Sequence, residues 1–210
     1  MGCYPLFCCT NWSELKADID ELVRELICIS LVTDPFGSYD TQDLQNCFKD
    51  KFVPFKTHFV ADLRRPPGEF VTKHHRHYAR RALRHLDVER CDEPQQFLDE
   101  WVALYDNLIA RHQLSGIKAF SRRAFSMQLA IPGIVMLRAK CRGETVGAHL
   151  WYVQGDVVHS HVAATSARGY DLMAPFALYW FALQTFASDA VPRHPHCCQI
   201  GDFNERTSGK

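Results

Sequence analysis

Two histidines in the segment VVHSHVAAT (157–165) are the side chains whose type and spacing best suit acid–base chemistry. His159 and His161 alternate within a run typical of a β-strand. Imidazole titrates near neutral pH, so either residue could take a proton from a reacting amine. The same pattern also suits ordinary hydrogen-bonded histidines of a sheet, and both interpretations stay open.

A third histidine, His149, raises the question of a metal site. We assume a two-residue turn at Gly155-Asp156 between this strand and the one before it. Tyr152 then faces the first of the two alternating histidines, and Leu150 faces the second. Paired residues share a face of the sheet, so these two histidines stand together while His149 points to the other face. This arrangement disfavours a three-histidine metal site.

The turn after this strand, Ser166 to Asp171, has the composition of an anion site at the start of a helix. Free N–H groups at a helix start carry partial positive charge, Gly169 permits close approach of a phosphate, and Arg168 adds a forked donor. Tyr170 could donate a proton to a substrate or a leaving sulfur, or simply pack on the sheet. An ordinary strand-to-helix turn with a solvated arginine is the alternative interpretation.

Two other clusters offer weaker signals. HPHCC (His194–Cys198) holds four potential zinc ligands, but they are nearly contiguous and no second cluster has zinc spacing, so we expect a loop that enters a strand and no bound metal. The segment Arg76–Arg84 forms a basic helical face, which is either solvated or in contact with an anionic partner.

Composition narrows the functional classes. Lys+Arg and Asp+Glu both number 24, so no overall charge points to nucleic acid or to a membrane surface. No apolar run is long enough to span a bilayer, and the start MGCYPLFCC lacks the features of a signal peptide. The nine irregularly spaced cysteines fit no disulfide framework, and we expect most to be buried in a reducing cytoplasm.

The first 70 residues predict a partial N-terminal α/β region. A helix begins near Glu14, Leu26–Thr33 is predicted to be a buried strand, and Thr41 caps a short helix. Phe55–Leu63 is predicted to be another strand, and Arg64–Glu69, with two prolines and a glycine, is predicted to be a linker.

Residues 71–210 predict an α/β (α+β) fold with a mixed, mostly antiparallel sheet flanked by helices. After the basic helix comes a strand, Asp87–Cys91, then a long helix with an apolar stripe and a short helix begun by Ser121. Three strands joined by tight turns follow, and then a helix over Leu172–Ala187.

These segments resemble the GNAT acyltransferase superfamily, most closely its FemAB-like, double-domain branch. The residues that carry the likeness lie between 70 and 187, in HHRHYARRAL, FLDEWVALYDNLIARHQLSGIKAFS and GETVGAHLWYVQGDVVHSHVAATSARGYDLMAPFALYW. The resemblance implies an acyl-coenzyme A that lies across the end of the third meander strand, with its pyrophosphate at the Ser166–Asp171 turn. It also implies that the strand Val157–Ala164 supplies an oxyanion N–H. The residues expected to bind the coenzyme are Val162, Ala164, Arg168, Gly169, Tyr170, Met173 and Ala174.

The predicted function is therefore N-acyl transfer from acetyl-coenzyme A, or another acyl-coenzyme A, to an amine. The acceptor would be a small molecule or a peptidoglycan or polysaccharide precursor. FemAB-like aminoacyl transfer from tRNA and a truncated, non-catalytic remnant are the alternatives. We expect the GNAT-like domain to be incomplete at its C-terminus, so that an exposed sheet edge favours homodimerisation.

Overall fold

The computed structural model describes residues 7, 9–54, 58–116, 119–189 and 198–200. The chain forms two compact units, Met1–His58 and Phe59–Lys210, and each is described by itself. The division lies earlier in the chain than the boundary after residue 70 that the sequence suggests, and independent folding of 1–70 and 71–210 stays a prediction. Within the described ranges, no helix is long and apolar enough to cross a membrane.

The first unit is a small helical cluster. It contains η1 (Trp12–Glu14), α1 (Leu15–Leu22) and α2 (Thr41–Cys47). Apolar side chains on the two α-helices meet in a core of Leu15, Ile19 and Leu44, as their helical spacing predicts.

Two predictions for this unit are wrong. Leu26–Thr33 does not form a strand: Thr33 makes an isolated bridge with Phe7, while the side chain of Ile27 is fully exposed. The cap of α2 is Asp40, whose side chain accepts a hydrogen bond from the backbone of Gln42, so the helix begins at Thr41 itself.

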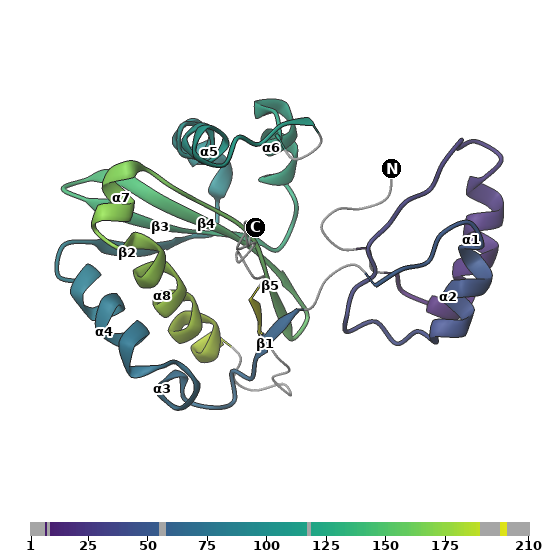
Figure 1. The fold of residues 1–210 in the computed structure, drawn as a ribbon, viewed down its shortest axis with the longest axis horizontal. Coiled ribbons are helices and arrows are strands. Elements are labelled where there is room, and N and C mark those ends of the chain that lie inside the picture. Colours follow the sequence, from purple (N-terminus) through teal and green to yellow (C-terminus); the bar gives the residue numbers. More distant parts are fainter. Residues whose placement is uncertain (1–6, 8, 55–57, 117–118, 190–197, 201–210) are drawn as a thin grey trace, which may run out of the picture. The chain divides into compact units, whose positions relative to one another are not determined.

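The second unit is built on a six-stranded sheet in the order β1-β6-β5-β4-β3-β2 (Figure 1). Strands β2 to β5 form an antiparallel series, β6 runs parallel to β5, and β1 is antiparallel to β6. This confirms the mixed, mostly antiparallel α/β fold. The strands are β1 (Phe59–Ala61), β2 (Asp87–Cys91), β3 (Ile134–Cys141), β4 (Glu144–Gln154), β5 (Val157–Thr165) and β6 (Cys198–Ile200).

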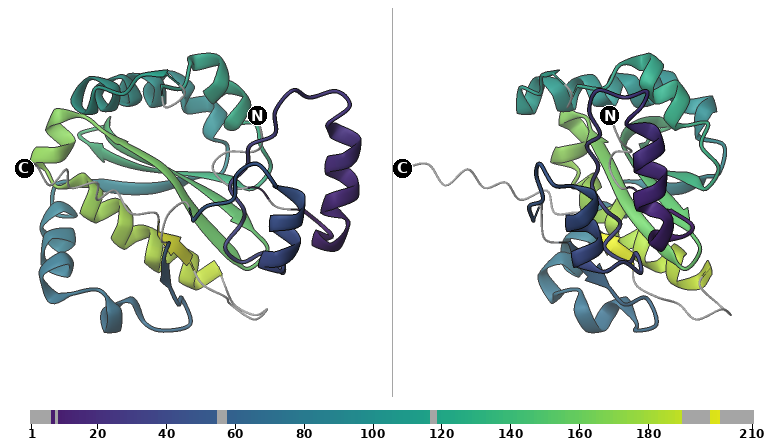
Figure 2. Two further views of the ribbon diagram at one scale, coloured as in Figure 1. Left: turned by 45° about the vertical axis from the view of Figure 1, so that its right-hand side comes forward. Right: turned by 90° about the vertical axis from the view of Figure 1, so that its right-hand side faces the viewer.

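Helices cover both faces of this sheet, as the views in Figures 1 and 2 agree. One face carries α4 (Lys73–Ala82) and α8 (Ala174–Asp189), and a core that includes Trp151 and Leu178 lies beneath them. The other face carries α5 (Leu98–His112) and α6 (Arg122–Gln128) over a core that includes Trp101 and Leu150. We call these the α8 face and the α5 face.

Tight turns explain the close match between the predicted and observed meander. Arg142 and Gly143, between β3 and β4, both have positive φ, the geometry of the two-residue turn that suits a twisted hairpin. The turn at Gly155-Asp156 also has the predicted length. Two-residue turns fix the register of the strands at each hairpin end.

Elements at the start of this unit depart from the sequence prediction. β1 occupies only Phe59–Ala61 of the predicted strand 55–63, and residues 55–57 lie outside the described ranges. The predicted linker Arg64–Glu69 runs into the short helix α3 (Pro67–Phe70), because proline is well tolerated in a first helical turn.

The expectation that most cysteines are buried is also wrong for the part of the chain that the structure describes. Cys91 and Cys141 are buried, whereas Cys28 is exposed and both Cys9 and Cys47 are half-buried. Burial raises the pKa of the Cys91 thiol, so this side chain packs as a neutral thiol.

Candidate functional site

A β-bulge in β5 is the central feature of the candidate site. Leu150 of β4 pairs with Val162 and Trp151 pairs with Ser160, so the strand pairing skips His161, which is the extra residue of the bulge. On the other edge of β5, the parallel ladder with β6 reaches only Val158 and His159. In the described ranges, the edge from residue 160 onward has no neighbouring strand. At the bulge and along this edge, the described strands do not complete the ladder of β5.

The bulge changes the predicted environment of His161. Leu150 is not opposite His161, as an unbroken register required, because the bulge shifts the pairing by one residue. Nε2 of His161 lies 3.0 Å from Oε1 of Gln128 on α6, and its ring lies 5.0 Å from the ring of Tyr152. A carbonyl oxygen accepts, so with this amide orientation Nε2 carries the proton and Nδ1 carries the basic lone pair.

His159 lies on the same face as His161. It pairs with Tyr152, as the sequence predicted, but its exposed fraction is only 5%. Burial also raises the pKa of Tyr152 to about 12, so this phenol remains protonated at neutral pH. His149 points to the opposite, α8 face, where its ring lies 4.8 Å from that of Tyr179. The described residues contain no group of histidine, cysteine or carboxylate side chains able to hold a metal ion.

The predicted anion turn is a short helix, α7 (Ala167–Asp171). Ser166 caps it by accepting a hydrogen bond from the backbone N–H of Gly169, and the serine hydroxyl donates to the carbonyl of Val146 on β4. A Cβ on Gly169 would lie 2.1 Å from that carbonyl oxygen. The glycine is therefore required by close packing of α7 on β4, in addition to any role beside a phosphate.

The predicted ligand side chains of this turn already have protein partners. Arg168 is half exposed and bonds to Glu144 at 3.0 Å and to the sulfur of Cys141 at 3.3 Å. The guanidinium of Arg111 lies 4.1 Å from the ring centre of Tyr170. Exposed ion pairs stabilise proteins by about 0–1 kcal/mol, so an anion could displace Glu144 from Arg168 at little cost.

The other residues predicted to bind the coenzyme have side chains that are mostly buried in the core, so a ligand would meet their backbone groups. Val162 and Ala164 are buried in the core of the α5 face. Ala174, the first residue of α8, is completely buried, and Met173 just before it has a φ of 61°. This left-handed residue separates α7 from α8, so two helix starts, at Ala167 and Ala174, follow the end of β5.

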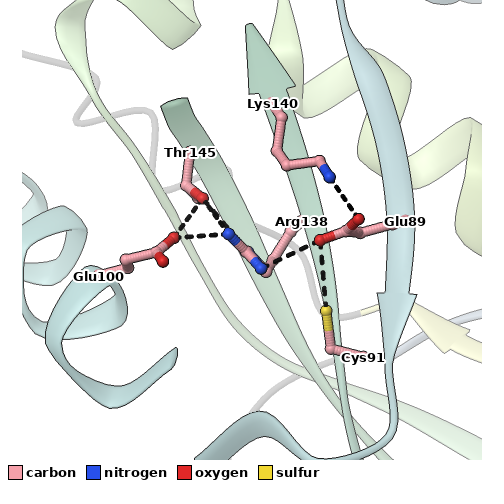
Figure 3. Close-up of polar contacts among 6 residues, drawn as sticks. All are labelled: Glu89, Cys91, Glu100, Arg138, Lys140 and Thr145. Carbon is pink, nitrogen blue, oxygen red and sulfur yellow. Dashed lines mark hydrogen bonds and ion pairs between the residues drawn. The ribbon is translucent and has the colours of Figure 1, made fainter. Parts of the chain in front are cut away.

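Sequence reasoning missed a charged cluster around the buried Arg138 on the α5 face (Figure 3). Arg138 of β3, whose side chain is 8% exposed, pairs with Glu89 at 3.0 Å and with Glu100 of α5 at 2.7 Å. Its guanidinium also bonds to Thr145, and Lys140 bonds to Glu89 and is the main cause of the lowered pKa of that carboxyl. Two cations face two carboxylates, so the cluster is neutral and fastens α5 to the sheet.

A cleft of about 350 Å³ lies between the segment after β2 and the connection from α6 to β3, lined by residues that include Glu93, Gln96 and Ile131. Its residues adjoin the beginning of β3, whereas α7 contacts the opposite end of that strand through Cys141. The cleft and the α7 turn are therefore separate features.

A protein-family model described as an acetyltransferase (GNAT) domain matches residues 72–193. Comparison with curated proteins gave no significant match.

Several solved structures share the fold. FemX superposes with a TM-score of 0.57 at 10% identity, covering 72% of this chain and 55% of its own. The C-terminal domain of a putative lysylphosphatidylglycerol synthetase from Agrobacterium fabrum gives a TM-score of 0.55 at 15% identity, covering 69% of this chain and 45% of its own. The chain thus spans about half the length of these structures.

Proposed function

The chain belongs to the GNAT acetyltransferase family, and on this premise we propose that it transfers an acyl group from an acyl-coenzyme A to an amine. The observation that carries the proposal is the bulged, open edge of β5, which leads directly into the α7 turn. Backbone donors for a thioester carbonyl and a phosphate-binding turn then lie on one continuous segment, residues 160–174.

We assign the donor site to the end of β5 and the two helix starts that follow it. The pyrophosphate would accept from backbone N–H groups of α7 and from the guanidinium of Arg168 after its release from Glu144. Val162 and Ala164 would contribute backbone groups along the strand, while Gly169, Met173 and Ala174 shape the turn.

The chemical step requires a base, an oxyanion donor and a proton for the leaving group. His161 is the proposed base, because it is less buried than His159 and its Nδ1 carries a lone pair. The amine nitrogen attacks the thioester carbon and loses its proton to this imidazole, while an N–H of the bulge holds the oxyanion. The C–S bond then breaks, and the thiolate takes up a proton, for which Tyr170 is the proposed donor.

A thermal unfolding experiment tests the donor site. Acetyl-coenzyme A at about 100 times its dissociation constant should stabilise the folded chain by about 2.7 kcal/mol. Arg168→Ala should abolish most of the shift, whereas Arg65→Ala, which removes the exposed pair with Glu69, should leave it unchanged. A cooperative transition that acetyl-coenzyme A does not move would contradict the proposal.

One observation favours a second candidate, aminoacyl transfer from tRNA. The helix α4 carries Lys73, Arg80 and Arg81 on its exposed surface, and no described carboxylate pairs with them. Phosphate backbones bind such surfaces with strong salt dependence. RNA binding that weakens steeply with salt, together with no response to acetyl-coenzyme A, would favour this candidate. A chain that folds stably but binds neither acetyl-coenzyme A nor RNA would instead fit the third alternative, a non-catalytic remnant.

The acceptor and its location complete the proposal. The proposed acceptor is an amine on a small molecule or on a peptidoglycan or polysaccharide precursor, presented in the cytoplasm to His161, whose side chain lies on the α5 face. Once an acceptor is found, the acyl-transfer rate of the wild-type chain and of His161→Gln is measured as a function of pH. If His161 is the base, the fall in rate at low pH should be present in the wild-type chain and absent in the variant, whereas a structural histidine would leave it in both.

A further inference from the structure

His149 is a buried polar residue that the proposed chemistry leaves unused. Its exposed fraction is 1%, and its ring lies 4.3 Å from that of Trp151 on the α8 face. Nε2 lies 2.8 Å from the hydroxyl oxygen of Ser160 on the neighbouring strand. Nδ1 is buried, and no hydrogen-bonding group of the described residues reaches it.

An imidazole in this position is costly. A buried nitrogen without a partner loses its hydrogen bonds to water, and an apolar side chain of similar size would avoid that loss. Burial keeps the ring neutral, since it lowers the pKa of His149 to about 3. The hydrogen bond between its other nitrogen and Ser160 is the polar contact that offsets part of this cost.

Ser160 stands at the point where the strand pairing shifts. It is the last residue in the first register, opposite Trp151, and the next paired residue, Val162, already belongs to the second register. In a strand, a slip of one residue sends every following side chain to the opposite face. A bulge displaced by one position would therefore move His161 off the α5 face and change the direction of the backbone amides around it.

We propose that His149 is a positioning residue that fixes the β5 bulge through its hydrogen bond to Ser160. The bond joins the side chain of His149 on β4 to that of Ser160, the residue of β5 just before the register shift. It therefore holds the bulge at this one position. It thereby sets the direction of the His161 side chain and of the backbone amides of the bulge. The part of this inference that concerns catalysis rests on the proposed acyl transfer.

The first test needs no ligand and no activity. Amide hydrogen exchange of residues 162–164, which rejoin the ladder after the bulge, is measured by NMR in the full chain. Ser160→Ala and His149→Leu should each accelerate exchange about tenfold, as expected when one anchoring hydrogen bond is lost. His149→Gln, whose amide reaches the position of Nε2, should restore slow exchange.

Val158→Ala is the matched control, because Val158 lies on the same strand and the same face but makes no polar bond. It should alter exchange across the whole sheet evenly. Unchanged exchange at 162–164 in a folded Ser160→Ala variant would overturn the inference, as would failure of His149→Gln to differ from His149→Leu.

A second test addresses catalysis. Ser160→Ala should lower kcat for acyl transfer about tenfold while KM for acetyl-coenzyme A stays within about twofold, because the bulge acts on the reacting atoms and not on the nucleotide. A changed KM with unchanged kcat would overturn the catalytic part. If the wild-type chain transfers no acyl group, the proposed function fails, and the exchange experiment still decides whether His149 positions the bulge.

Discussion

The buried His149 makes the stability of the second unit depend on pH in a way that can be calculated. Its pKa is about 3 in the folded chain, against 6.5 for an unperturbed imidazole. As the pH falls below 6.5, the unfolded chain binds a proton on this ring and the folded chain does not. Stability is therefore fully present above the unfolded pKa and is lost progressively toward the folded pKa.

The size of the loss follows from the two pKa values. Between about pH 7.5 and about pH 5, the unfolded ring changes from largely neutral to almost fully protonated, while the folded ring stays neutral. About 1.5 pH units of this range lie below the unfolded pKa of 6.5. At 1.36 kcal/mol per unit, the free energy of unfolding should fall by about 2 kcal/mol from this residue alone.

The assay is urea unfolding of the wild-type chain and of His149→Gln across this pH range. Both carry Trp12→Phe, so that tryptophan fluorescence reports only the unit that contains Trp101, Trp151 and Trp180. All other histidines contribute equally to the two proteins, so the difference between the curves isolates His149. The wild-type chain should lose about 2 kcal/mol more than the variant. Parallel pH dependences would refute the reasoning, because they would mean that the ring is protonated in the folded chain.

Three further variants test the packing of the second unit, each by urea unfolding. Gly169→Ala should cost about 3 kcal/mol or more, because its Cβ would meet the carbonyl of Val146, whereas Gly68→Ala, which meets only the end of a flexible arginine, should change stability by less than about 0.5 kcal/mol. Arg138→Met should lower the free energy of unfolding by about 2 kcal/mol, which is less than for a fully buried ion pair because Glu89 and Glu100 are partly exposed. A loss no larger than that of Arg65→Met, which removes an exposed pair, would show that the cluster does not hold α5 on the sheet. Trp101→Ala should cost about 3–5 kcal/mol because the indole is completely buried, and a smaller loss would mean that the core of the α5 face collapses around it.

Strong periodicity and tight turns made the centre of the fold predictable. β3 runs from Ile134 to Cys141, the bounds that its apolar run suggested, because two-residue turns end the strands sharply. The long helix α5 also follows its apolar stripe, with Trp101, Leu104, Tyr105 and Leu108 buried.

Local pattern failed where a neighbouring chain segment decides the outcome. The apolar run 26–33 has strand composition, but a strand needs a partner, and in the described ranges only Thr33 bridges to another segment. The bulge in β5 likewise leaves no local signature, since it depends on which residues of β4 lie opposite.

The site residues named from the sequence stay predictions. Gly169 was expected to let a phosphate approach the backbone, whereas the group that lies close to it in the structure is the carbonyl of Val146, from a strand that local sequence does not indicate. Gln128 beside His161 comes from a different helix, and the Arg138 cluster draws residues from four elements, so neither has a spacing that the sequence could show.

The most direct test of the central claim is NMR mapping of coenzyme A binding on the isotope-labelled chain. We expect the largest amide shifts to fall in one continuous segment, from Ser160 at the bulge through α7 to Ala174. Arg168→Ala should weaken coenzyme A binding without moving these shifts to other residues. Saturable shifts centred elsewhere, for example on the cleft beside Glu93, or no shifts at saturating coenzyme A, would contradict it.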